Sequence, residues 1–128
     1  MAMPRVLIVD AEEIQIRALA AGLALEGMAV AFAGTCDAAL LHLAAPESAD
    51  LALIDLMIPG LNGLDLARRI RRDFPQVRVL LTSIYHLSAR QLELADCGAL
   101  GFVPKPYKLG ELCSFVRAKA RAVSAATC

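Results

Sequence analysis

Short hydrophobic runs alternate with helical patterns along the whole chain. Five of these runs have the length of β-strands: residues 5–10, 28–32, 51–55, 77–81 and 101–103. Between them, hydrophobic residues recur every three or four positions, which is the spacing of one helix face. We expect helices at residues 12–26, at the segment that carries Ala38, Leu40, Leu41 and Leu43, and at residues 64–74, 89–96 and 108–123. The pattern therefore predicts five successive strand–helix units.

Residues that start or stop helices support these boundaries. Gly27 and Gly98 are expected to end the first and fourth helices, because glycine adopts the left-handed conformation that closes many helices. Thr35 or Asp37 is expected to begin the second helix, since a side-chain oxygen there accepts a hydrogen bond from an amide of the first turn.

The alternation of strands and helices predicts the fold class. Strands separated by helices pair in parallel through right-handed crossovers, and continuously apolar strands indicate a sheet that is covered on both faces. Pro104 suits an edge strand, where a missing N–H costs little. We therefore predict an α/β fold: a flavodoxin-like, doubly wound, five-stranded parallel sheet in the strand order 2-1-3-4-5, with five helices.

Four polar residues are expected at one edge of this sheet. Ligands of open α/β sheets bind beyond the carboxyl ends of the strands, where the strand order reverses, which is here between strands one and three. Those strands end in Asp10 and Asp55, the fourth ends in Thr82-Ser83, and the fifth runs into Lys105. Two carboxylates, a hydroxyl and an ammonium group therefore converge.

This set of groups supports phosphoryl chemistry. Carboxylates beside a loop carbonyl suit Mg²⁺, which also accepts phosphate as a ligand. A carboxylate can attack phosphorus to give an aspartyl phosphate, while a metal ion and a lysine neutralise the phosphoryl oxygens. A threonine hydroxyl can then donate a hydrogen bond to the new phosphoryl group.

Four sequence segments point to one protein family. In chain order they are V-L-I-V-D (6–10), D-L-M-I-P-G-L-N-G (55–63), L-L-T-S (80–83) and F-V-P-K-P-Y (102–107). In their order and spacing they resemble the CheY-like receiver domains of two-component response regulators, over nearly the whole chain. The resemblance implies that Asp55 is the phosphoacceptor, that Lys105 bridges to it, and that Thr82 is the switch hydroxyl. It also implies a histidine kinase or a phosphotransfer protein as the partner that supplies the phosphoryl group.

The resemblance further implies a Mg²⁺ site made by Asp10, Asp55 and the backbone carbonyl of Met57. This chain departs from the family there, because Ala11 stands where the family usually has a second acid. Loss of one charged ligand predicts weaker Mg²⁺ binding, by about 1–3 kcal/mol. Glu12 is one residue too far along the chain to replace it. A degenerate receiver that works as a phosphorylation-independent interaction or dimerisation module therefore stays open as an alternative.

Other family positions carry further expectations. Phe102 matches the aromatic residue whose rotation reports phosphorylation, and the bond between Lys105 and Pro106 is expected to be cis. Met57 and Ile84 match the two positions that flank the phosphoryl group; both are apolar, so we expect slow hydrolysis of the acyl phosphate. The face of the last two helices and the last strand, where Phe102, Tyr107 and Leu109 lie, is expected to bind partners, with a homodimer as one possibility.

Composition is that of one folded globular domain. Hydrophobic residues make up 58% of the 128 residues, and Lys+Arg and Asp+Glu balance at 13 each. We expect one receiver domain at residues 1–123 and a short tail at 124–128. The balanced charge gives no reason to expect direct nucleic-acid or membrane binding. Apolar runs well below ~20 residues and the lack of a signal sequence favour a cytoplasmic protein. The four cysteines are expected to be buried thiols rather than disulfides, and Arg68, Arg69, Arg71 and Arg72 a solvated helix face.

Two other classes of protein fit the sequence less well. A phosphohydrolase of the haloacid dehalogenase type would need its D-x-D signature at Asp10-Ala11-Glu12, which is an imperfect match. A flavin-binding protein would need hydroxyl and amide donors after the first strand, where the acidic residues Glu12 and Glu13 would repel the flavin phosphate. We therefore expect a switch rather than an enzyme.

Overall fold

A computed structural model describes residues 3–46, 48–58, 62–85 and 87–126. It contains one sheet of five parallel strands in the order β2-β1-β3-β4-β5, as predicted. The strands are β1 (Arg5–Val9), β2 (Ala29–Ala33), β3 (Leu51–Asp55), β4 (Arg78–Ser83) and β5 (Gly101–Pro104). The helices are α1 (Glu13–Leu25), α2 (Cys36–Ala44), α3 (Gly63–Asp73), α4 (Ala89–Ala95) and α5 (Leu109–Ala126).

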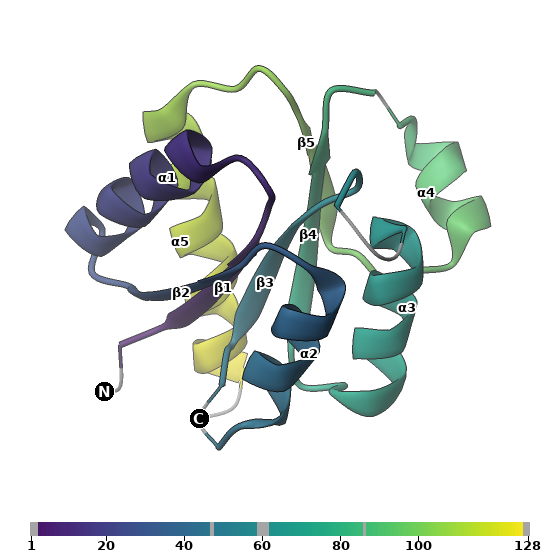
Figure 1. Cartoon of the computed structure of the whole chain (residues 1–128), viewed down its shortest axis with the longest axis horizontal. Coiled ribbons are helices and arrows are strands. Elements are labelled where there is room, and N and C mark those ends of the chain that lie inside the picture. The colour runs from purple at the N-terminus through teal and green to yellow at the C-terminus, as the bar shows by residue number, and fades with distance from the viewer. Residues whose placement is uncertain (1–2, 47, 59–61, 86, 127–128) are drawn as a thin grey trace.

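The sheet is sandwiched between two layers of helices (Figure 1). Successive residues of β1 point to opposite faces, so Leu7 and Val9 pack toward α2 and α3 while Val6 and Ile8 pack toward α1 and α5. Each such side chain is almost fully buried and contributes about 1.5–3 kcal/mol relative to an exposed one. The continuous apolar runs of the sequence are explained by this two-sided burial.

Element ends differ from the sequence expectations by a few residues. β4 extends through Thr82 to Ser83, because Thr82 pairs with Asp55 on β3 and Ser83 pairs with Pro104 on β5. Of the two candidate caps of α2, Thr35 is used: its hydroxyl accepts a hydrogen bond of 3.1 Å from the N–H of Ala38. α5 continues to Ala126 rather than ending at residue 123, since no glycine or proline interrupts it. The division into a domain and a tail stays a prediction.

Two smaller expectations are confirmed. Cys36, Cys97 and Cys113 are buried, as expected of core thiols, while Cys128 and His86 lie outside the described residues. The arginines of α3 lie on an exposed face and each is paired with an acid: Arg68 with Asp65, Arg69 and Arg72 with Asp73, and Arg71 with Asp96. Within the described ranges, none of the helices combines the length and the apolar character that crossing a membrane requires.

Candidate functional site: an acid–lysine cluster at the sheet edge

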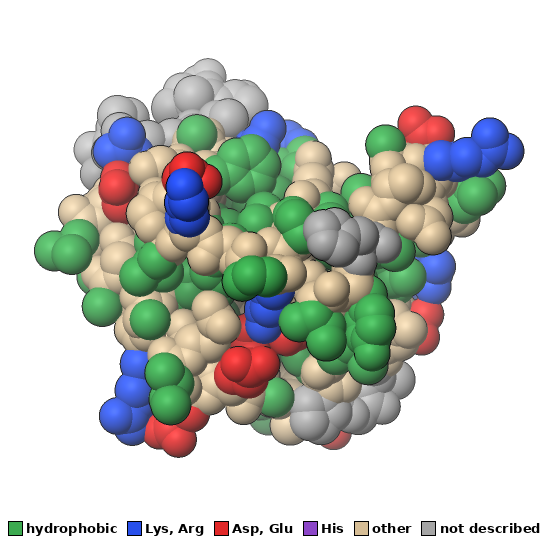
Figure 2. Space-filling model, turned by 90° about the horizontal axis from the view of Figure 1, so that it is seen from above, with side chains coloured by type: hydrophobic (Ala, Val, Ile, Leu, Met, Phe, Trp, Pro, Cys, Tyr) green, Lys and Arg blue, Asp and Glu red, His purple; other side chains and the backbone are tan. Residues whose placement is uncertain are grey.

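The predicted polar residues come together at the carboxyl ends of the strands. Asp10 follows β1, Asp55 is the last residue of β3, Thr82 lies near the end of β4, and Lys105 follows β5. Figure 2 looks onto this edge and shows acidic and basic side chains meeting near the middle of the face, between hydrophobic side chains. The parallel arrangement brings these groups together because all five strands end at the same edge.

Lys105 bridges the two carboxylates. Its Nζ lies 2.9 Å from Oδ2 of Asp55 and 3.1 Å from Oδ2 of Asp10. Asp10, Asp55 and Lys105 expose only 2%, 8% and 9% of their surface. Charged groups this deeply buried are tolerated only when they are paired and hydrogen-bonded, and the three satisfy that condition. The two carboxylates outnumber the single ammonium group, so one negative charge of the cluster is not compensated.

The other oxygen of each carboxylate is fixed by its own loop. Oδ1 of Asp10 accepts a hydrogen bond of 2.9 Å from the N–H of Glu12, and Oδ1 of Asp55 accepts one of 2.9 Å from the N–H of Met57. Both are local turns in which an aspartate binds the amide two residues later. They orient the carboxylates so that each Oδ2 faces the lysine.

The pKa of Lys105 is raised above its ordinary value. Burial by itself lowers the pKa of an ammonium group, but the hydrogen bonds to Asp55 and Asp10 and the charges of these carboxylates outweigh that effect. Lys105 therefore stays positively charged at neutral pH.

Thr82 carries an unsatisfied hydroxyl beside this cluster. Its side chain is 2% exposed, and its Oγ1 has no hydrogen-bond partner among the residues that the structure describes. A buried polar atom without a partner costs about 1–3 kcal/mol. The register pairs Thr82 with Asp55 on the neighbouring strand. A ligand with hydrogen-bond acceptors at Asp55, such as a phosphoryl group, suits this hydroxyl.

The donor set suits a hard cation but is short of acids. The carboxylates of Asp10 and Asp55 are oxygen donors of the kind that Mg²⁺ takes. Ala11 is exposed and offers no side-chain ligand, and Glu12 is exposed as well. In the described part of the chain, no group of three or more His, Cys, Asp or Glu side chains is placed to hold a metal ion.

The structure also describes the other residues that the sequence singled out. The bond between Lys105 and Pro106 is cis, as expected. Met57 and Ile84 are each 63% exposed, whereas Phe102 is partly buried and packs against the core beneath α2 and α3. Part of the loop between Asp55 and Gly63, residues 59–61, lies outside the described residues.

Sequence reasoning missed one contact close to the cluster. Nε2 of Gln15, on α1, donates a hydrogen bond to the hydroxyl of Tyr107. Tyr107 was expected only as part of a docking face, but it is partly buried and packs against the core beneath α1 and α5. Burial, together with the charge of Asp10, raises the pKa of Tyr107 to about 12 despite the opposing charge of Lys105. The two residues lie 92 positions apart, so no local sequence pattern links them.

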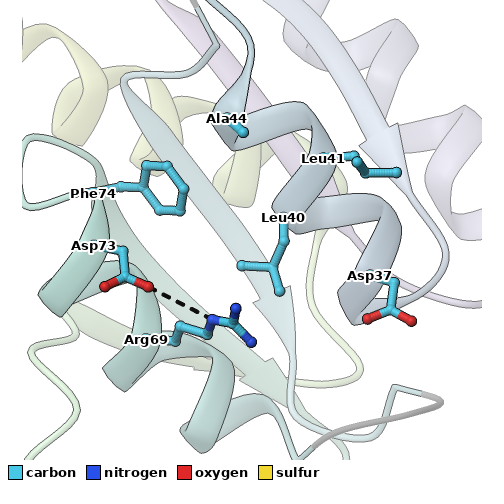
Figure 3. A pocket seen from close by; sticks show the side chains of 7 residues that line it. All are labelled: Asp37, Leu40, Leu41, Ala44, Arg69, Asp73 and Phe74. Carbon is cyan, nitrogen blue, oxygen red and sulfur yellow. Dashed lines mark ion pairs between the residues drawn. The ribbon is translucent and has the colours of Figure 1, made fainter.

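A separate hollow of about 460 Å³ lies between α2 and α3. It is lined by apolar and charged side chains, which Figure 3 shows: Leu40, Leu41, Ala44, Phe74, Asp37, Arg69 and Asp73. On one side of the hollow, Nε of Arg69 and Oδ2 of Asp73 form an ion pair at a distance of 3.6 Å. The hollow shares no residue with the acid–lysine cluster and is distinct from it.

Comparisons with known proteins agree with this geometry. Residues 6–117 match the response regulator receiver domain family. The DNA-binding response regulator MtrA of Mycolicibacterium smegmatis is 37% identical over 117 residues, which are 91% of this chain and 50% of that protein. The uncharacterized transcriptional regulatory protein YkoG of Bacillus subtilis is 34% identical over 116 residues, again 91% of this chain and 50% of that protein.

A solved structure gives the same result. The crystal structure of a response regulator from Thermotoga maritima superposes with a TM-score of 0.78 and 30% identity, covering 91% of this chain and 97% of that one. This chain spans about half the length of the two curated relatives. The matched family, the strand order and the convergence of Asp10, Asp55 and Lys105 together show that the chain belongs to the response regulator receiver domain family.

Proposed function

We propose that this receiver domain accepts a phosphoryl group on Asp55 from a histidine kinase or a phosphotransfer protein. The observation that carries the proposal is the pairing of Asp55 with Lys105 at 2.9 Å beside the unpartnered hydroxyl of Thr82. Asp55 supplies the nucleophile and Lys105 supplies a neutralising charge. The hydroxyl of Thr82 supplies a hydrogen-bond donor for the transferred phosphoryl group.

The transfer balances as a displacement at phosphorus. A carboxylate oxygen of Asp55 attacks, a phosphorus–oxygen bond forms, and the phosphorus–nitrogen bond of the donor phosphohistidine breaks. The electron pair of that bond stays on the imidazole nitrogen, which takes up a proton. Lys105 is buried, charged and already in contact with Asp55, so its ammonium group is close enough to neutralise phosphoryl oxygens on that residue.

After transfer, the hydroxyl of Thr82 donates to a phosphoryl oxygen and the cost of its burial is removed. A shift of Thr82 toward Asp55 opens space beneath β4 and β5, and Phe102 on β5 turns inward. Through this change the face formed by α4, β5 and α5 is switched. That face exposes Leu94 (75%), Leu100 (39%), Leu109 (38%) and Phe115 (37%), which suits a protein partner or a second copy of the chain.

Mg²⁺ binding is proposed to be weakened. Asp10, Asp55 and the carbonyl of Met57 would hold the ion, which supplies charge neutralisation at phosphoryl oxygens when bound. Because Ala11 contributes no ligand, restoring one with Ala11→Asp is expected to tighten Mg²⁺ binding by about 1–3 kcal/mol, as measured by calorimetry. The exposed position of Ala11 accommodates the new side chain. Equal affinities in the two proteins would contradict the proposal.

The main test is incubation with a small phosphodonor, with and without Mg²⁺, followed by intact-mass measurement. The wild type is expected to gain one phosphoryl group and Asp55→Asn none. Lys105→Ala should lose most of the uptake while still binding Mg²⁺. A wild-type protein that gains no mass at any Mg²⁺ concentration would overturn phosphoacceptance.

The acyl phosphate is proposed to be long-lived. The exposed side chains of Met57 and Ile84 carry no group that can orient an attacking water. Without a phosphatase, we expect the phosphorylated protein to persist for minutes or longer, and Met57→Asn to shorten this lifetime. A half-life of seconds in the wild type would contradict the proposal.

The degenerate receiver is the second candidate, and one observation favours it. Lys105 already hydrogen-bonds to both carboxylates, in a site where Ala11 offers no acidic side chain. In that case the α4–β5–α5 face binds its partner constitutively. Partner binding or dimerisation that is equal in the wild type, in Asp55→Asn and in the beryllofluoride-treated protein would favour this function over phosphoacceptance.

A further inference from the structure

The loop that carries Lys105 is tied to α1 by a contact in which none of the reacting atoms takes part. Gln15 lies at the start of α1, and its amide donates a hydrogen bond to the hydroxyl of Tyr107, two residues after Lys105. Both side chains are partly buried. The ring of Tyr107 packs against the core beneath α1 and α5, so ring and hydroxyl are both engaged on the α1 side.

This loop has few backbone donors of its own. Pro104 and Pro106 have no N–H group. The N–H of Lys105 donates to the carbonyl of Ser83 on β4 at 2.8 Å, which holds the beginning of the loop, and α5 starts at Leu109. Tyr107 lies between these two anchors, and its hydroxyl fixes the middle of the loop to a different helix.

Lys105 depends on such an anchor because its side chain is long and flexible. Its ammonium has to satisfy Asp55 at 2.9 Å and Asp10 at 3.1 Å at once. Holding a lysine in one conformation opposes its rotamer entropy. A displacement of the loop backbone would break one of the two contacts or stretch both.

The start of α1 also fixes one of the acids that Lys105 meets. The N–H of Glu12, the residue that precedes α1, donates to Oδ1 of Asp10 at 2.9 Å. One end of α1 therefore holds Asp10 through its backbone and the Lys105 loop through Gln15. The N-terminal end of α1 therefore contributes to the positions of both Asp10 and Lys105.

We propose that Gln15 and Tyr107 are positioning residues that hold Lys105 between Asp10 and Asp55. Neither residue touches the reacting atoms; they act through Lys105. The consequence for phosphoryl uptake rests on the proposed function, whereas the effect on the lysine itself does not.

The direct test follows the ammonium group of Lys105 by NMR in protein labelled with ¹⁵N-lysine. The chain has three lysines, so Lys108 and Lys119 serve as internal references. Exchange of the Nζ protons of Lys105 is expected to be about 3- to 10-fold faster in Tyr107→Phe and in Gln15→Leu than in the wild type, as when one ordinary hydrogen bond is lost. A purely structural role would change all three lysines or none.

Controls separate the contact from general damage. Gln76→Leu removes the same amide at an exposed position and is expected to leave Lys105 unchanged. The double variant Gln15→Leu/Tyr107→Phe is expected to match the single variants, because both remove the same contact. Gln15→Met, which keeps the length of the side chain, replaces Gln15→Leu if that variant does not fold.

The rate of phosphoryl uptake from a small donor completes the test. If the positioning role holds, the variants are slowed at saturating donor by about the factor seen in exchange. If the wild type takes up no phosphoryl group but its variants still change the exchange of Lys105, the proposed function fails and the positioning role stands. If folded Tyr107→Phe and Gln15→Leu leave the exchange of Lys105 at the wild-type rate, the positioning role is overturned.

Discussion

Helices α3 and α4 cover the same face of the sheet side by side, but different forces hold them (Figure 1). α3 buries Gly63, Leu66, Ala67 and Ile70. α4, of seven residues, has none that is fully buried, and Leu92 and Ala95 only rest against the edge of the core. α3 is therefore held by apolar packing along its length, whereas α4 is held mainly at its ends.

The ties at the ends of α4 are polar and exposed. At its start, Ser88 and Gln91 form a reciprocal capping box. At its end, Nε of Arg68 donates to the carbonyl of Ala95 at 2.8 Å, and Arg71 pairs with Asp96 at 2.9 Å. The two arginines belong to α3, so α4 is fastened to its better-packed neighbour. We conclude that α4 is the least costly helix to displace, which suits the proposed switching of the α4–β5–α5 face.

The largest expected contrast comes from removing one apolar side chain from each helix. Ile70 is fully buried, so Ile70→Ala is expected to lower the free energy of unfolding by about 2–5 kcal/mol. Leu94 is 75% exposed, and Leu94→Ala should change it by about 0.5 kcal/mol or less. Urea denaturation measures both. Equal losses would show that α4 is packed as tightly as α3.

The start of α3 is expected to be sensitive in a second way, because Gly63 lies against the backbone of Asp55 and Leu56. A methyl group at Gly63 would lie 2.6 Å from Cα of Leu56 and 3.0 Å from the carbonyl oxygen of Asp55. Gly63→Ala should therefore cost about 1–3 kcal/mol of stability and slow phosphoryl uptake. Gly110→Ala, where no atom lies within 4 Å, is the matched control and is expected to stabilise α5 by about 0.5–1 kcal/mol. If Gly63→Ala left the stability unchanged, the backbone after Asp55 would be able to move aside at little energetic cost.

Removing a polar tie should loosen α4 and spare α3. In Arg71→Ala, hydrogen exchange of the α4 amides is expected to rise by roughly two- to fivefold, while the α3 amides exchange as in the wild type. Arg90→Ala changes an exposed arginine on α4 itself and serves as control. Unchanged exchange in α4 would mean that the capping box and the contact of Arg68 hold this helix by themselves.

The smallest expected effect is a pH dependence of the ion pair between Arg71 and Asp96. The hydrogen bond from Arg71 lowers the pKa of Asp96 below its ordinary value. The pairing therefore contributes fully above about pH 4, the pKa of an unfolded aspartate, and is lost as the pH falls through the lower folded value. An NMR titration of the Asp96 carboxyl should give a midpoint below 3.8, and Arg71→Ala should raise it. Identical midpoints would show that the two side chains do not pair in solution.

The sequence alone determined the architecture and most of the site. Continuous apolar runs predicted buried parallel strands, and the reversal of strand order predicted where Asp10, Asp55, Thr82 and Lys105 meet. These inferences succeed because strand periodicity and crossover handedness are general constraints that depend little on individual side chains. That residue 11, next to Asp10, is an alanine without a carboxylate was likewise visible in the sequence.

Tertiary packing decided which atoms touch. The direction of each carboxylate oxygen, the unpartnered hydroxyl of Thr82 and the contact between Gln15 and Tyr107 depend on rotamers and on residues far apart in the chain. The contacts of Arg68 and Arg71 with the end of α4 also depend on tertiary packing. The sequence predicted only that these arginines belong to a solvent-exposed helix face. Hydrophobic periodicity records which side of an element is buried, but it carries no information about which polar partner a long side chain reaches once the elements are packed.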